Sequence, residues 1–361
     1  MTDIFNNFYK GKRVLVTGHT GFKGSWLSIW LHSLGAEVVG VSLDPCSDRD
    51  NYVLSGIGGR ILADLRADIR DAEAMKSIFA QYRPEIVFHL AAQPLVRLSY
   101  EIPAETYMTN VMGTINVMEA IRATDSVRVG VMITTDKCYD NKERITGYRE
   151  DDPFGGYDPY SSSKGACEVA IQSWRRSFFN PDDYGRKHHV SLASVRAGNV
   201  IGGGDWAKDR IVPDCIRAIE AGKPVVIRNR NAVRPWEHVL EPLSGYMLLA
   251  GRMWDNPTEY CEGWNFGPEA ESVSTVWDVA SAIVADMGRG SLEDRSDPDA
   301  PHEANLLMLD ITKAKTRLGW RPRLDFRQTA ALVADWYSRY SGEEVYDLCL
   351  EEIEKFCRQV L

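Results

Sequence analysis

A short apolar strand, a glycine-rich turn and a periodic apolar segment follow one another near the start of this chain. Residues 13–17 are strand-like, a turn of spacing G-x-x-G-x-x-G follows, and the spacing predicts a helix over 25–34. Glycines at this spacing permit a tight turn and a close approach of backbone N–H groups to a pyrophosphate, whose charge the helix N-terminus also stabilises. The unit predicts a dinucleotide site whose contacts are Gly18, Thr20, Gly21, Phe22, Lys23 and Gly24.

The same alternation of strand and helix continues through the first half of the chain. Strands are predicted over 37–43, 60–63, 85–90, 127–134 and 190–195, and helices over 71–82, 104–123 and 161–178. Helices between strands imply crossover connections, so we expect an α/β fold with a doubly wound parallel sheet of Rossmann type.

After residue 196 the alternation fails, and glycines and prolines interrupt the chain. We therefore expect a dinucleotide-binding domain over 1–196 and, over 197–361, mainly a smaller, irregular α/β lobe that binds the substrate. Segments near 235–267 are candidates to return to the first domain.

Charge and cysteine content exclude several classes of protein. Forty-two Lys and Arg face 51 Asp and Glu, and the net charge of -9 argues against nucleic acid as a main partner. Seven scattered cysteines without a C-x-x-C pair indicate reduced thiols and the cytosol, and we expect no metal site. A signal peptide and an apolar run of about 18 residues are not seen, so neither secretion nor a membrane partner is expected.

The end of the second predicted strand bears on which dinucleotide binds. Asp44 follows that strand, and neither Arg nor Lys lies between Gly40 and Asp48, which favours NAD over NADP. The register leaves open whether Ser42 or Asp44 faces the adenosine ribose. Asp68 and Ile69, after the next strand, are the candidates for flanking the adenine.

A tyrosine and a lysine stand four positions apart at the start of the helix predicted over 161–178. This spacing places Tyr160 and Lys164 on one helix face. A nearby positive charge favours the phenolate and lowers the pKa of the phenol, as a base acting on a sugar hydroxyl requires. Thr134 and Thr135 end the preceding strand, at the sheet edge where ligands bind in such folds.

Four segments together resemble the extended short-chain dehydrogenase/reductase superfamily and, within it, the CDP-glucose 4,6-dehydratase family. They are GHTGFKGS at 18–25, HLAAQ at 89–93, TTDKCY at 134–139 and RPWEHV at 234–239. The lysine after Thr-Asp separates the chain from other nucleotide-sugar dehydratases, which carry Glu there. The resemblance implies NAD as cofactor, CDP-D-glucose as substrate and CDP-4-dehydro-6-deoxy-D-glucose as product.

The resemblance also implies a role for each residue of the site. Tyr160 removes the C4 hydroxyl proton, Thr135 bonds the same oxygen and Lys164 holds the nicotinamide ribose and the phenolate. Asp136 donates a proton to the departing C6 hydroxyl. Lys137 either removes the C5 proton or stabilises the enolate as a cation, and both roles stay open because an ordinary ammonium group cannot accept a proton.

Further contacts and a partner complete the expectations. Leu90, Ala91 and Ala92 are assigned to the cofactor, and the substrate set comprises Gln93, Asn199, Trp206, Arg210, Arg234 and His238. Arg210 and Arg234 are the choices for the pyrophosphate because guanidinium groups match phosphate oxygens. The helices over 104–123 and 161–178 are expected to form a four-helix homodimer interface, as in related proteins, or to pack within the chain.

Two other functions stay open. A nucleotide-sugar epimerase or dehydrogenase of the same superfamily needs Tyr160, Lys164 and NAD but no acid for the C6 elimination, so Asp136 and Lys137 argue against it. A non-catalytic nucleotide-binding protein on the same fold is the other alternative, since a fold does not determine a function. The presence of Thr135, Tyr160 and Lys164 disfavours it.

Overall fold

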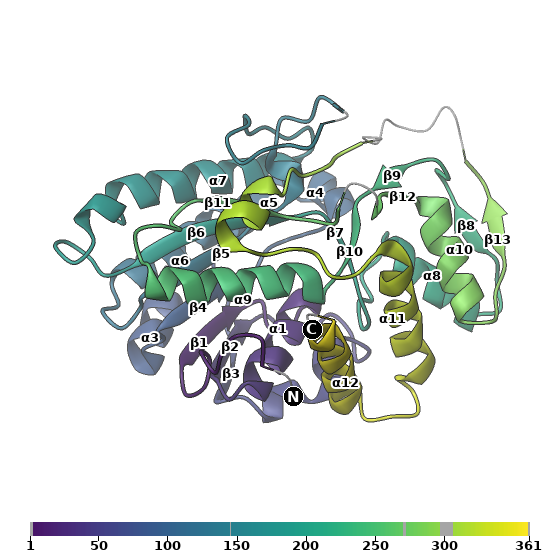
Figure 1. Ribbon diagram of the computed structural model, residues 1–361, viewed down its shortest axis with the longest axis horizontal. Helices are drawn as coiled ribbons and strands as arrows, with labels where there is room; N and C mark the ends of the chain where they lie inside the picture. Colours follow the sequence, from purple (N-terminus) through teal and green to yellow (C-terminus); the bar gives the residue numbers. More distant parts are fainter. Residues whose placement is uncertain (1–2, 145, 270–271, 297–305, 360–361) are drawn as a thin grey trace.

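A seven-stranded parallel sheet forms the centre of the molecule (Figure 1). The computed structural model describes residues 3–144, 146–269, 272–296 and 306–359. The strand order is β11-β6-β5-β4-β1-β2-β3. The strands are β1 (Arg13–Thr17), β2 (Glu37–Ser42), β3 (Ala63–Arg66), β4 (Ile86–His89), β5 (Val129–Ile133), β6 (Ser191–Ala197) and β11 (Gly263–Phe266). The predicted doubly wound parallel sheet is confirmed.

Two helical layers cover the sheet because its strands are apolar on both faces. Val14 and Val16 of β1 point toward one layer and Leu15 points toward the other. The first layer includes α1 (Phe22–Ser33) and α9 (Leu240–Asp255), and the second consists of α3 (Ala72–Tyr82), α6 (Gly113–Arg122) and α7 (Pro159–Ser177). The carboxyl ends of the parallel strands meet at one edge of the sheet, where ligands bind in such folds.

Two predicted elements differ from the structure. The strand expected over 60–63 begins at Ala63, because α2 (Asn51–Ser55) and the short helix η1 (Ile57–Gly59), joined by the left-handed Gly56, occupy the chain before it. The helix expected over 104–123 is divided into α5 (Pro103–Tyr107), a π-helical turn η2 (Met108–Met112) and α6. A short helix α4 (Val96–Glu101) precedes it.

A smaller lobe lies at one end of the molecule, to the right in Figure 1. It contains α8 (Ile211–Glu220), β8 (Val225–Ile227), α10 (Val276–Asp286) and β13 (Leu292–Asp294). Two small ladders connect it with the sheet: β7 (Asn199–Ile201) pairs with β10 (Trp236–His238), and β9 (Val233–Arg234) pairs with β12 (Ser274–Thr275). The chain returns from the smaller lobe to the seven-stranded sheet, where β11 pairs with β6.

The C-terminal segment packs against both the sheet domain and the smaller lobe. It contains the π-turn η6 (Ala314–Leu318), α11 (Phe326–Arg339) and α12 (Val345–Arg358). α12 contacts α1 and α2, whereas α11 contacts α10 and β10. Among the described residues, no helix combines the length and the apolar character needed to cross a membrane.

Candidate active site

The glycine-rich turn joins the end of β1 to the start of α1. Gly18 has a φ of +77°, and a Cβ there would lie 2.7 Å from the backbone nitrogen of Ala91. A Cβ on Gly24 would lie 2.0 Å from the Gly18 carbonyl oxygen. Both positions therefore require glycine, because any side chain would open the turn.

The N-terminus of α1 is available for an anion. Gly21 precedes the helix, its first turn carries no acidic residue, and within the described part of the chain no side chain caps its N–H groups. Unpaired N–H groups and the helix dipole favour a phosphate at this position. The residues present thus fit the pyrophosphate of a dinucleotide.

Beside Ser42 and Asp44, the residues predicted to face the adenosine ribose, lies an arginine that the sequence analysis missed. The Ser42 hydroxyl lies 2.7 Å from the Thr20 hydroxyl and is buried, whereas the Asp44 side chain is 87% exposed. Arg66 of β3 pairs with Ser42 in the sheet register, and its guanidinium lies 3.0 Å from Asp44. Because β3 was predicted over 60–63, this neighbour could not be foreseen.

The other predicted cofactor residues lie along the strand ends. Asp68 forms an ion pair with Arg70, whose hydrogen bonds lower the pKa of the Asp68 carboxyl. Ile69 is buried and packs against Gly113, so closely that a Cβ on that glycine would collide with the Ile69 side chain. The backbone N–H groups of Leu90 and Ala91 donate to Thr17, which fixes the end of β4 against β1. Ala92 is half-buried.

Thr135, Asp136 and Lys137 lie at the carboxyl end of β5, where the short helix η3 (Asp136–Cys138) begins. The Thr135 hydroxyl donates to Asp136 Oδ1 at 2.9 Å. Asp136 is 2% exposed, and its Oδ2 has no hydrogen-bond partner among the described residues. Burial raises the pKa of Asp136, although the half-buried Lys137 and the Thr135 hydrogen bond act in the opposite direction. Burial therefore shifts the pKa of Asp136 in the direction that a proton donor needs.

Tyr160 lies next to Thr135 at the start of α7, and its side chain is buried. Burial raises its pKa, and a hydrogen bond with Thr135 and the charge of Arg210 oppose that rise. Lys164 is also buried and donates from Nζ to the Ile133 carbonyl at 3.2 Å, at the end of β5. The raised pKa of Tyr160 is opposite to the direction predicted from Lys164, because burial outweighs the charges around the phenol.

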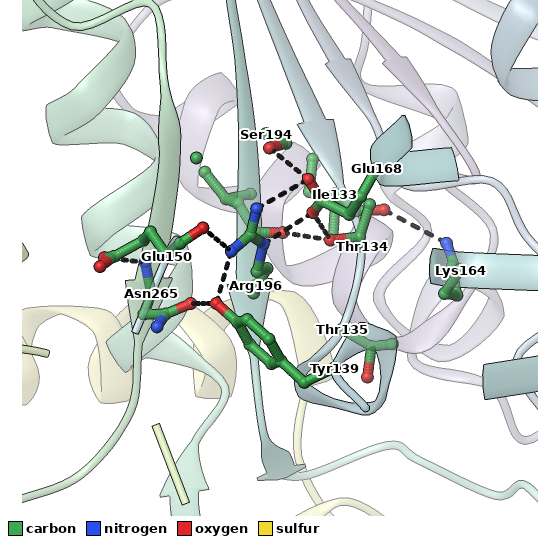
Figure 2. A network of polar contacts seen from close by, with 12 residues as sticks. Ile133, Thr134, Thr135, Tyr139, Glu150, Lys164, Glu168, Ser194, Arg196 and Asn265 are labelled. Carbon is green, nitrogen blue, oxygen red and sulfur yellow. Dashed lines mark hydrogen bonds and ion pairs between the residues drawn. The ribbon is translucent and has the colours of Figure 1, made fainter. Parts of the chain in front are cut away.

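A buried polar network fixes α7 against the sheet (Figure 2). The Arg196 guanidinium of β6 donates from Nε and Nη2 to both carboxylate oxygens of Glu168, each at 2.9 Å. Thr134 and Ser194 also donate to Glu168. Burial acts to raise the pKa of Glu168, but Arg196 and the two hydroxyls lower it overall. Since Glu168 lies one helical turn after Lys164, the network fixes Lys164 at the end of β5.

Two of the predicted substrate residues lie at the junction with the smaller lobe. Asn199 is half-buried at the start of β7. Arg210 precedes α8, forms an ion pair with Asp205 at 2.7 Å and lies near enough to Tyr160 and Lys23 to shift their pKa values. Its guanidinium therefore belongs to the same site as the phenol.

The side chains of three other predicted substrate residues are engaged elsewhere in the protein. The guanidinium of Arg49 lies 3.5 Å from the centre of the Trp206 ring, so one face of that ring is covered. The Gln93 amide donates to Thr106 and accepts from the Leu95 N–H. His238 is fully buried, 2.8 Å from Glu352 of α12. These contacts point the three side chains into the protein.

Arg234, the remaining predicted substrate residue, lies in β9. It is half-buried, and its Nη1 donates to the Val233 carbonyl at 2.9 Å.

Three groups near Asp136 extend the site beyond most of the predicted contacts: the half-buried Lys23 and the buried Glu237 and Tyr246. Lys23, predicted only as a cofactor contact, has a pKa lowered by burial to about 8, with Glu237 and Asp136 acting to raise it. Glu237 of β10 and Tyr246 of α9 were not predicted at all. Glu237 lies in the segment RPWEHV that carries the family resemblance, but only the β10 register and the packing of α9 bring it and Tyr246 near Asp136.

Comparisons with known proteins identify the family of this chain. The family model described as GDP-mannose 4,6 dehydratase matches residues 15–333. The CDP-glucose 4,6-dehydratase of Salmonella typhimurium is 48% identical over 354 residues, which cover 98% of this chain and 98% of that protein. The predicted resemblance to this family is thereby confirmed.

Two solved structures share the fold. UDP-glucose 4-epimerase of Thermus thermophilus, in complex with NAD, is 26% identical with a TM-score of 0.75, covering 90% of this chain and 98% of that one. The dTDP-glucose 4,6-dehydratase of Bacillus anthracis, also with NAD, is 20% identical with a TM-score of 0.74, covering 94% and 100%. The chain therefore belongs to the GDP-mannose 4,6 dehydratase family, within the extended short-chain dehydrogenase/reductase superfamily.

Proposed function

We propose that this protein is a CDP-glucose 4,6-dehydratase that converts CDP-D-glucose into CDP-4-dehydro-6-deoxy-D-glucose with NAD as a recycled cofactor. The observation that carries the proposal is the 48% identity, over 98% of the chain, to a protein of that activity. The glycine turn and the uncapped N-terminus of α1 are the groups that would hold the dinucleotide. Bound there, NAD would supply the chemistry of a hydride acceptor for C4 and a hydride donor for C6 of the sugar.

Tyr160 carries the first proton transfer in this proposal. As a phenolate it removes the proton of the C4 hydroxyl, and the Thr135 hydroxyl bonds the same oxygen. Because burial raises the pKa of Tyr160, the phenolate needs nearby positive charge, which Arg210 supplies in this structure. Lys164, held at the end of β5, is the residue for the nicotinamide ribose.

Asp136 supplies the acid for the elimination. The C4 ketone makes the C5 proton acidic, and a base removes it while protonated Asp136 donates to the C6 hydroxyl, which leaves as water. Lys137 serves either as that base or as a cation beside the enolate, and both roles remain compatible with its half-buried position near Asp136. An epimerase would not need an acid at this place, so the buried carboxyl favours the dehydratase.

Incubation of the purified protein with CDP-glucose tests the function. Product should show the ultraviolet absorbance of a 4-keto-6-deoxy sugar in alkali, and UDP-, GDP- and dTDP-glucose should give much less. NADH should not build up with product, because the hydride is returned. Turnover of another nucleotide sugar, or NADH formed in proportion to product, would contradict the proposal.

We further propose that the protein acts in the cytosol as a homodimer. Its seven cysteines are free, which fits a reducing compartment. Large apolar side chains are exposed on neighbouring helices, with Tyr107, Met108 and Met112 on α5 and η2 and Val169 on α7. α5 and η2 both contact α7, and in this proposal a second copy of the chain covers the exposed apolar side chains of all three elements.

A further inference from the structure

Beside the strand end that is expected to contact the adenosine ribose lies an arginine to which the proposed function gives no role. Arg66 ends β3, the outer strand of the sheet next to β2, and pairs in register with Ser42 (Figure 1). The Ser42 hydroxyl lies 2.7 Å from Thr20 Oγ1, which also donates to the Leu43 carbonyl at 3.0 Å. The end of β2 is therefore held against the glycine-rich turn, with Arg66 on the neighbouring strand.

Two side chains hold the guanidinium of Arg66 independently of Asp44. Its Nη1 donates to Asp64 Oδ1 at 2.6 Å, and its Nη2 donates to the Tyr52 hydroxyl at 2.7 Å. Tyr52, which is buried, donates in turn to Asp64 Oδ2 at 2.5 Å. The fully buried His19 of the glycine-rich turn lies with Nε2 2.6 Å from Asp64 Oδ1. Since these partners are fixed by one another, Arg66 should keep its place when the charge of Asp44 is removed.

The carboxylate that anchors Arg66 is charged at neutral pH. Burial acts to raise the pKa of Asp64, but hydrogen bonds with Arg66, Tyr52 and His19 lower it overall to about 2. The anchor is thus an ion pair reinforced by two further hydrogen bonds.

Asp44, the third partner of Arg66, is held far less firmly. Arg66 Nε donates to Asp44 Oδ1 at 3.0 Å, and the Asp44 side chain is 87% exposed. Exposed ion pairs contribute little to stability, so Asp44 can be replaced without loss of the fold. While Asp44 is present, two carboxylates face one guanidinium, and the group made by Asp44, Asp64 and Arg66 carries a net negative charge.

This charge balance bears on which dinucleotide the protein takes. NAD and NADP differ by one phosphate on the 2′ oxygen of the adenosine ribose. A carboxylate accepts a hydrogen bond from a 2′-hydroxyl and repels a 2′-phosphate, whereas a guanidinium matches phosphate oxygens. The structure places both kinds of group side by side at the end of β2.

We propose that the guanidinium of Arg66 is a latent 2′-phosphate site, which its ion pair with Asp44 keeps closed to NADP. The proposal rests on the proposed function, which places the adenosine ribose of NAD at the end of β2. It goes beyond the role expected of Asp44 alone, because losing the Asp44 carboxylate should create affinity for NADP only while Arg66 is present.

Isothermal titration of the purified full-length protein with NAD and with NADP tests the latent site. Unaltered protein should bind NAD more tightly than NADP. Asp44→Ala should bind NADP at least about tenfold more tightly than the unaltered protein does, because Arg66 then bonds the 2′-phosphate. NAD should bind more weakly to the same variant. Asp44→Ala/Arg66→Met should lose the gain for NADP.

Two further variants serve as controls. Asp125→Ala removes another exposed carboxylate, which lies 2.8 Å from Arg83, and should leave both affinities unchanged. Asp44→Ala/Arg66→Lys keeps the positive charge without the planar guanidinium, so it should show only part of the gain for NADP even if Arg66→Met folds poorly. Circular dichroism checks that each variant is folded.

The failures of the two proposals can be told apart. An affinity for NADP that does not rise in Asp44→Ala, or a rise that persists in Asp44→Ala/Arg66→Met, would overturn the latent site while the dehydratase function stands. Unaltered protein that makes no 4-keto sugar from CDP-glucose in the presence of NAD would overturn the function. The titrations do not depend on turnover, so each result is read separately.

Discussion

At the scale of the residue, Tyr160 combines deep burial with a hydrogen bond to Thr135. We expect Tyr160→Phe to lower kcat by on the order of 10²-fold or more, because a positioned acid–base group contributes that much. NAD and CDP-glucose should still bind, as isothermal titration would show. Tyr157→Phe is the matched control, since Tyr157 is 93% exposed and should keep full activity.

A second residue-scale prediction concerns the turn before α1. Gly24→Ala places a methyl group 2.0 Å from the Gly18 carbonyl oxygen, so the turn must open. Its backbone N–H groups would then no longer point toward the pyrophosphate. NAD binding should weaken by at least about tenfold, or about 1.4 kcal/mol. Gly59→Ala meets no atom within 4 Å and should bind NAD normally. Equal affinities would refute the assignment of this turn.

At the scale of the element, the pair Arg196–Glu168 holds α7 on β6. Arg196→Met leaves the Glu168 carboxylate buried without its guanidinium and should cost about 3–5 kcal/mol of unfolding free energy. Urea denaturation measures this loss. The exposed pair Arg83–Asp125 provides the control, because Arg83→Met should cost only about 0–1 kcal/mol.

The same network predicts a pH dependence of stability. The pKa of Glu168 is lower in the folded state than in an unfolded chain, so its contribution is present above the unfolded value of about 4.3. That contribution should be lost as pH falls through the folded pKa, where the carboxylate takes up a proton. Glu168→Gln should therefore flatten the stability profile below about pH 4.3. An unchanged slope would assign the acid sensitivity to other groups.

The elements also show how far sequence reasoning reaches. The strand–turn–helix at 13–34 was predictable because glycine spacing and apolar periodicity are local properties. The position of β3 was not, because η1 and the turn at Gly56 delay its start. The position of Arg66 beside Ser42 and Asp44 was therefore not predicted either. Glu237 stands in the RPWEHV segment that carries the resemblance, but its position near Asp136, like that of Tyr246, depends on tertiary packing.

At the scale of the whole molecule, the apolar surface on α5, η2 and α7 predicts self-association. Val169→Glu, on a position that is 56% exposed, should convert the proposed dimer into a monomer because a buried charge opposes docking. Sedimentation velocity measures the change. Val226→Glu, on the smaller lobe with 41% exposure, should leave the dimer intact. A Val169→Glu protein that remains dimeric would place the interface elsewhere.

The path of the chain through β11 has a consequence for how the protein is made. β6 ends at Ala197, and its outer neighbour begins only at Gly263, after much of the smaller lobe. A nascent chain emerging from the ribosome therefore exposes an unsatisfied β6 edge until the later segment arrives, and such an edge invites pairing with other chains. We infer that the emergence of β11, rather than synthesis of the first half, is the event that covers the β6 edge and protects the nascent chain from aggregation.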